Sequence, residues 1–178
     1  MDAAEIEAHL VEVAEILREA DPTGPVHKIV IAGGALLAWI GLRDATRDVD
    51  SVEPIAPEVA AAAAEVAGHH DLPPAWLNDS SRGFLPEGFS QADCRVLLRL
   101  PRLLVLGISD QMAFLMKINA ARARGVDFHD AARLWPTAGY LTAQDAADAY
   151  WRAYSHEDPA SDPHFVSYIE QVIAYASG

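Results

Sequence analysis

The strongest constraint on the fold is a short β-branched run that ends at two glycines. Residues His27 to Ala32 read HKIVIA, which is typical of a buried strand. Gly33 and Gly34 follow directly, and apolar residues then recur at helical spacing from Ala35 to Ile40. A strand that enters a helix through glycines exposes backbone N–H groups where a phosphate can bind. The pair alone predicts only a tight turn, and it lacks the G-x-G-x-x-G spacing of a dinucleotide-binding fold.

A second strand is predicted over residues 47–55, and it carries an Asp-x-Asp pair. Side chains two positions apart on a strand share a face, so Asp48 and Asp50 are expected side by side. Two such carboxylates repel each other unless a cation lies between them, and Mg²⁺ binds carboxylates together with phosphate oxygens. The pair is therefore suited to metal-assisted phosphoryl or nucleotidyl transfer. The alternative is that both aspartates lie on the solvent face of an edge strand. Other polar side chains lie close to the aspartates in the sequence: Thr46 offers a hydroxyl, and Arg43 and Arg47 offer guanidinium groups.

The rest of the chain predicts an α/β or α+β fold with a small mixed sheet and a helical C-terminal half. Periodicity and capping residues predict further helices over residues 2–20 and 57–68, after Ser109, from Asp127 or His129, and over residues 143–154 and 163–175. Two strands, 94–100 and 103–108, form a hairpin around Pro101, and residues 71–90 are a long loop. We expect residues 1–108 to form the core and 109–178 a helical part, packed together as one compact unit.

Composition limits the classes of function. The chain has 26 acidic and 13 basic residues and a net charge of −13, which argues against a general nucleic-acid coat protein. One cysteine, Cys94, excludes an intrachain disulfide and a multi-cysteine zinc site. The start of the chain lacks the features of a signal peptide, and no apolar run is long enough to span a bilayer. These features predict a cytoplasmic protein with no membrane partner.

The run IVIAGGALLAWIGLRDATRDVDSV resembles the opening motif of the polymerase-β-type nucleotidyltransferase superfamily. Its Gly-Gly, later Arg and Thr-x-Asp-x-Asp are similar to the AbiEii-like proteins, the toxins of type IV toxin–antitoxin systems, whose relatives include toxins that add nucleotides to tRNA. The stretches WLNDSSRGFLP and MAFLMKINAARARGVDFHDAARLW resemble the same group, so the resemblance spans Ile29 to Leu134. It implies a polymerase-β-type fold and Mg²⁺-dependent transfer of an NMP from an NTP, with tRNA a candidate acceptor and an antitoxin a candidate partner.

The resemblance also implies roles for individual residues. Those matching catalytic positions are Asp48, Asp50, Lys117 and either Asp127 or Asp130, of which Asp48 and Asp50 would bind the metal. Those matching nucleotide-binding positions are Gly33, Gly34, Arg43, Thr46, Lys117 and Arg122. The predicted strands CRVLLRL and LLVLGIS lack the third carboxylate that many members of the superfamily carry. Two alternatives therefore stay open: a catalytically inactive binding or regulatory protein, and a nucleotidyltransferase for small molecules such as antibiotics.

A lysine, two histidine-containing pairs and a set of arginines are further candidates for function. Lys117 lies on an apolar helix, where it either pairs with a carboxylate or extends its ammonium to solvent. The pair His69-His70 makes a poor metal site because adjacent helical residues point in different directions, and His129-Asp130 lacks the other motifs of a metal-dependent phosphohydrolase. If tRNA is the acceptor, a basic patch is expected. Its members would be Arg43, Arg47, Arg99, Arg102, Arg122 and Arg124.

Overall fold

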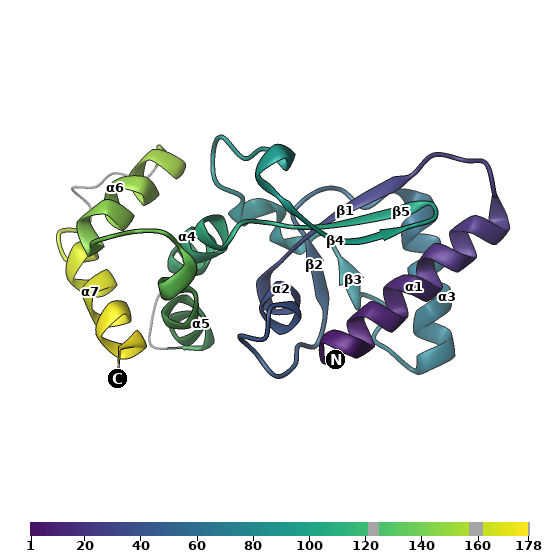
Figure 1. The fold of residues 1–178 in the computed structure, drawn as a ribbon, viewed down its shortest axis with the longest axis horizontal. Coiled ribbons are helices and arrows are strands. Elements are labelled where there is room, and N and C mark those ends of the chain that lie inside the picture. The colour runs from purple at the N-terminus through teal and green to yellow at the C-terminus, as the bar shows by residue number, and fades with distance from the viewer. Residues whose placement is uncertain (121–124, 157–161, 178) are drawn as a thin grey trace. The chain divides into compact units, whose positions relative to one another are not determined.

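The computed structural model of the chain describes residues 1–120, 125–156 and 162–177, which form a mixed α/β fold. They divide into two compact units (Figure 1). The first unit comprises Met1–Gly83 and Cys94–Ile108. The second comprises Phe84–Asp93 and Ser109–Gly178, so the segment from Phe84 to Asp93 groups with the helical half of the chain.

A five-stranded mixed sheet forms the centre of the first unit, in the order β3-β2-β1-β5-β4. Its strands are β1 (His27–Ala32), β2 (Val49–Ser51), β3 (Leu77–Asn78), β4 (Arg95–Leu100) and β5 (Leu103–Gly107). The central strand β1 is antiparallel to β2 and parallel to β5, and its last four residues are fully buried. The predicted strand β1 and the hairpin of β4 and β5 are confirmed.

Two parts of the sheet differ from the prediction. Strand β2 has three residues, where the sequence predicts a strand over residues 47–55. Pro54 and Pro57 follow it, and proline cannot donate to a strand ladder. Strand β3 was not predicted, because its two residues lie in a segment rich in proline and glycine. Trp76, directly before β3, is fully buried, and its indole N–H donates to the carbonyl of Ala63 at 2.8 Å.

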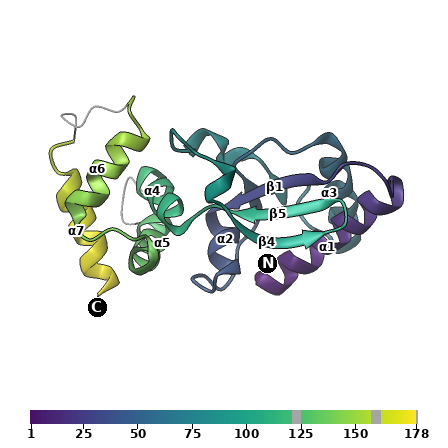
Figure 2. The ribbon, with the colours of Figure 1, turned by 45° about the horizontal axis from the view of Figure 1, so that its top comes forward.

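Three helices of the first unit gather on one side of the sheet: α1 (Ala3–Ala20), α2 (Gly33–Trp39) and α3 (Pro57–His70) (Figures 1 and 2). Helix α1 buries an apolar stripe at helical spacing. The stripe consists of Ile6, Leu10, Val13, Ala14 and Leu17. Helix α2 approaches the sheet at Gly107, where a Cβ atom would lie 2.8 Å from Cδ1 of Leu36. This contact fixes α2, and therefore the turn that begins it, against the middle of the sheet.

The second unit contains the helices α4 (Asp110–Ala120), α5 (Val126–Leu134), α6 (Ala143–Ala153) and α7 (Phe165–Ala176). The predicted caps are present: Ser109 Oγ accepts from the backbone N–H of Met112 at 3.2 Å, and Thr142 Oγ1 accepts from that of Asp145 at 3.1 Å. Helices α6 and α7 pack through aromatic rings, with the centroids of Tyr150 and Phe165 4.5 Å apart. In the described part of the chain, no helix combines the length and apolarity needed to cross a membrane.

Candidate functional site

The glycine turn at the end of β1 lies against the carboxylate of Asp50. The antiparallel pairing of β1 with β2 places Ala32 opposite Asp50, one residue before the turn. Gly33 has a φ of +62°, and a Cβ atom there would lie 3.2 Å from Oδ2 of Asp50. Only glycine adopts this left-handed backbone readily and leaves room for the carboxylate. The other oxygen, Oδ1, accepts a hydrogen bond of 2.9 Å from the hydroxyl of Ser80.

The second glycine of the turn lies against a hydroxyl and a guanidinium group. A Cβ atom at Gly34 would lie 2.6 Å from Oγ1 of Thr46 and 3.2 Å from Nη1 of Arg43. Hydrogen bonds fix the loop that carries both side chains. Arg43 Nε donates to the carbonyl of Ala45 at 2.9 Å, and the backbone N–H of Thr46 donates to the carbonyl of Met1 at 2.8 Å. A carboxylate, a hydroxyl and a guanidinium therefore converge on one turn.

Asp48 directly precedes β2 and is half-buried, as is Asp50. Val49 between them is fully buried, and Asp50 follows it within β2, whereas Asp48 lies just outside the strand. The alternative that the pair lies on an edge strand is wrong, because β2 pairs with β1 on one side and with β3 on the other.

Lys117 forms a buried ion-pair cluster with the aspartates of α5 in the second unit. Its ammonium lies 2.7 Å from Oδ1 of Asp127 and 2.9 Å from Oδ2 of Asp130, and Arg133 Nη1 lies 3.7 Å from Oδ1 of Asp130. The Lys117 side chain is 13% exposed, that of Asp127 39% and that of Asp130 0%. The alternative of a lysine that extends to solvent is therefore wrong. Both Asp127 and Asp130 contact the ammonium, so the ion pairs alone do not distinguish the two candidates for the late acidic position.

The predicted site residues thus fall into two groups, and each belongs to one unit. Gly33, Gly34, Arg43, Thr46 and Asp50 meet in the first unit, where Asp48 also lies. Lys117, Asp127 and Asp130 meet in the second. Arg122 lies outside the described residues. The carboxylates and hydroxyls of the first group are hard oxygen donors of the kind that Mg²⁺ prefers, and Arg43 can bind a phosphate oxygen.

The predicted basic patch is wrong at one position. Arg102 is 7% exposed and has a structural role, because its guanidinium donates to the carbonyls of Pro25 at 2.8 Å and Leu17 at 3.2 Å. These bonds join the end of α1 to the start of β1. Arg47 and Arg99 are exposed. Arg124, like Arg122, lies outside the described part of the chain.

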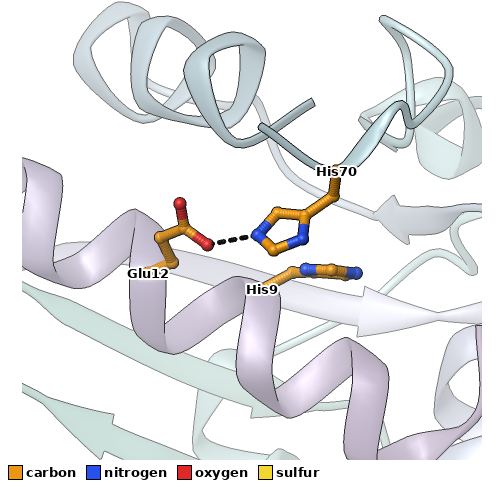
Figure 3. A group of neighbouring side chains, drawn as sticks. All are labelled: His9, Glu12 and His70. Atoms are coloured by element: carbon orange, nitrogen blue, oxygen red, sulfur yellow. Dashed lines mark hydrogen bonds and ion pairs between the residues drawn. The ribbon is translucent and has the colours of Figure 1, made fainter. Parts of the chain in front are cut away.

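A cluster that the sequence analysis missed joins α1 to the end of α3 (Figure 3). Glu12 Oε1 lies 2.7 Å from Nδ1 of His69, and Glu12 Oε2 lies 2.6 Å from Nε2 of His70. One ligand atom from each of His9, Glu12 and His70 lies within 4.8 Å of the others. Although His69 and His70 are adjacent on α3, both reach the same carboxylate. The spacing of His9 and Glu12, three residues apart on one helix face, was the available signal.

Electrostatic effects within this cluster differ between its members. Hydrogen bonds from His69 and His70 lower the pKa of Glu12. The hydrogen bond to Glu12 raises the pKa of His69. Burial, followed by the charge of His70, lowers the pKa of His9. The cluster thus favours the charged form of the Glu12 carboxylate and, through burial, the neutral form of the His9 imidazole.

Comparison of the chain with protein-family models, with curated proteins and with solved structures finds no match.

Proposed function

We propose that the protein is a Mg²⁺-dependent nucleotidyltransferase with a polymerase-β-type fold, which moves an NMP from an NTP to an acceptor. The observation that carries the proposal is the convergence of Asp50, Thr46 and Arg43 on the Gly33-Gly34 turn. The order of strand, glycine turn, helix and aspartate-bearing strand supports it, because the resemblance of the motif implies that order. A larger residue at either glycine would crowd these polar groups, so the turn leaves room for them at one place.

The residues of the first unit fit a hard divalent cation. Asp50 would hold Mg²⁺ through its carboxylate, which Ser80 and the glycine turn already orient. Asp48, which is half-buried and two residues before Asp50, would supply a second carboxylate. When bound, Mg²⁺ neutralises phosphate charge and stabilises the charge that develops during transfer.

The remaining polar groups have roles in binding the triphosphate. The Arg43 guanidinium is suited to pairing with phosphate oxygens, and the Thr46 hydroxyl can donate to one. In the reaction, an acceptor oxygen loses its proton and forms a bond to the α-phosphorus, the bond from that phosphorus to the β-phosphate oxygen breaks, and pyrophosphate leaves. Positioning and electrostatic stabilisation by these groups would supply most of the rate acceleration.

The second unit contributes less directly in this proposal. The resemblance assigns Lys117 to the triphosphate, but two carboxylates already neutralise its ammonium. A phosphate would have to compete with Asp127 and with the fully buried Asp130 for the same charge. We therefore assign triphosphate binding to Arg43, Thr46 and the glycine turn, and give Lys117 the role of stabilising the contact between α4 and α5.

The experiment uses the full chain, Mg²⁺, each of the four NTPs and total tRNA as the acceptor. Asp50→Asn keeps the shape of the side chain but removes its charge, and we expect it to lower nucleotide transfer by at least about 100-fold. Asp44→Asn is the matched control, because Asp44 is an exposed aspartate of the loop that precedes β2. Equal rates of nucleotide transfer in both variants would show that Asp50 does not take part in the reaction.

A catalytically inactive relative is the second candidate, and the missing strand carboxylate favours it. Calorimetry separates the two: the active enzyme would bind NTP in a Mg²⁺-dependent way, whereas an inactive binding protein would show no such binding. The toxin-like role further predicts that expression arrests growth and that Asp50→Asn abolishes the arrest. Growth arrest that persists in Asp50→Asn would show that any toxicity has another cause.

A further inference from the structure

We infer that His9, Glu12 and His70 form a binding site for a divalent transition metal of the zinc type, which joins α1 to the end of α3. The three residues come from two elements that are far apart in sequence and packed together in the first unit. This inference does not rest on the proposed nucleotidyl transfer, since none of the three belongs to the Asp50 site.

The geometry of the three side chains suits a single bound ion. The three ligand atoms lie within 4.8 Å of one another, and Figure 3 shows the carboxylate of Glu12 and the rings of His9 and His70 grouped beside α1. Two ligands of one zinc ion, each about 2.1 Å from the metal, lie at most about 4.2 Å apart. A rotation of the His70 ring can supply the difference, because that side chain is 42% exposed; the metal then replaces the 2.6 Å bond between Nε2 of His70 and Oε2 of Glu12.

The environment of the His9 ring also favours a bound metal. His9 is only 9% exposed. Its Nδ1 atom is buried and has no hydrogen-bond partner among the described residues. A buried polar atom without a partner costs about 1–3 kcal/mol, so it needs an explanation. Coordination to a metal provides one, since a neutral imidazole offers a lone pair to a cation.

The chemistry of the three ligands favours a transition metal of the zinc type. Two imidazoles and one carboxylate are a ligand set suited to zinc and related transition metals, whereas Mg²⁺ and Ca²⁺ prefer oxygen ligands alone. His69 bonds to the other oxygen of Glu12, as the outer partners of metal-binding carboxylates commonly do. The site is therefore chemically distinct from the Asp50 site, which offers only oxygen donors.

The test is a titration of the full, EDTA-treated chain with ZnCl₂ against a chromophoric chelator, repeated with CoCl₂ by visible spectroscopy. We expect one equivalent of zinc to bind, excess Mg²⁺ to leave it bound, and the melting temperature to rise with zinc concentration. His70→Ala and His9→Asn should each weaken binding by at least about tenfold. The exposed His70 makes the first variant safe for folding, which circular dichroism would verify.

Two matched controls exclude other ligands. His156→Ala removes an exposed histidine of the second unit, and Cys94→Ala removes the single thiol; both should bind zinc as the wild type does. Absence of saturable binding at millimolar zinc would overturn the inference. So would stoichiometric binding that His70→Ala leaves unchanged.

Discussion

Replacing Lys117 by methionine should destabilise the second unit far more than neutralising one of its partners. Methionine keeps much of the length of the side chain but leaves the carboxylate of Asp130, which is 0% exposed, without its nearest cation at 2.9 Å. Removing one partner of a buried ion pair typically costs about 3–5 kcal/mol. We expect about 3 kcal/mol, at the lower end of that range, because Arg133 remains 3.7 Å from the other oxygen of Asp130.

Asp127→Asn is the matched control, since it removes the second carboxylate from the same lysine. Asp127 is 39% exposed, so solvent screens its ion pair, and the expected loss is about 1 kcal/mol or less. Urea unfolding followed by circular dichroism would measure both variants, and hydrogen exchange of α4 and α5 would locate the effect. Replacing Asp130 by leucine together with Lys117→Met should recover most of the stability, because an apolar pair can substitute for a buried ion pair. Equal losses in Lys117→Met and Asp127→Asn would refute this reasoning.

Three further predictions concern stability. Gly34→Ala should cost about 1–3 kcal/mol, since the new methyl group would lie 2.6 Å from Oγ1 of Thr46. Gly68→Ala, where α3 leaves open space, should instead be neutral or stabilise by about 0.5–1 kcal/mol in the same thermal melts. Arg102→Ala should cost about 2 kcal/mol through its lost hydrogen bonds, whereas the exposed Arg99→Ala should change stability by less than about 0.5 kcal/mol; equal effects would contradict the structural role of Arg102. Burial raises the pKa of Tyr140 to about 12 and also raises the pKa values of Tyr154 and Tyr168. Unfolded tyrosines lose their protons near pH 10 while these folded ones keep theirs, so the stability of the second unit should fall as the pH rises above about 10, and flat stability between about pH 10 and 12 would contradict this.

The local elements could be predicted because each is encoded in neighbouring residues. The β-branched run gave β1, the stripe from Ile6 to Leu17 gave α1, and Ser109 and Thr142 marked helix starts. The motif also led to the glycine turn and to Asp50, whose proximity follows from the antiparallel pairing of β1 and β2.

What could not be predicted depends on contacts between distant segments. Strand β3 exists because it pairs with β2 beside the buried Trp76, and two residues carry no periodicity of their own. Arg102 was predicted to be a surface cation because the sequence around it does not reveal the two distant carbonyls to which its guanidinium donates. The cluster of His9, Glu12 and His70 requires α1 to pack on α3, which no motif in either helix specifies.

The most direct test of nucleotidyl transfer compares one NTP labelled at the α-phosphate with the same NTP labelled at the γ-phosphate, incubated with the chain, Mg²⁺ and total tRNA. The proposal predicts that the α-label becomes attached to the acceptor, that the γ-label appears only in pyrophosphate, and that Asp50→Asn abolishes both changes while Asp44→Asn does not. Transfer of the γ-label to the acceptor, or transfer of the α-label that Asp50→Asn leaves unchanged, would contradict the proposal.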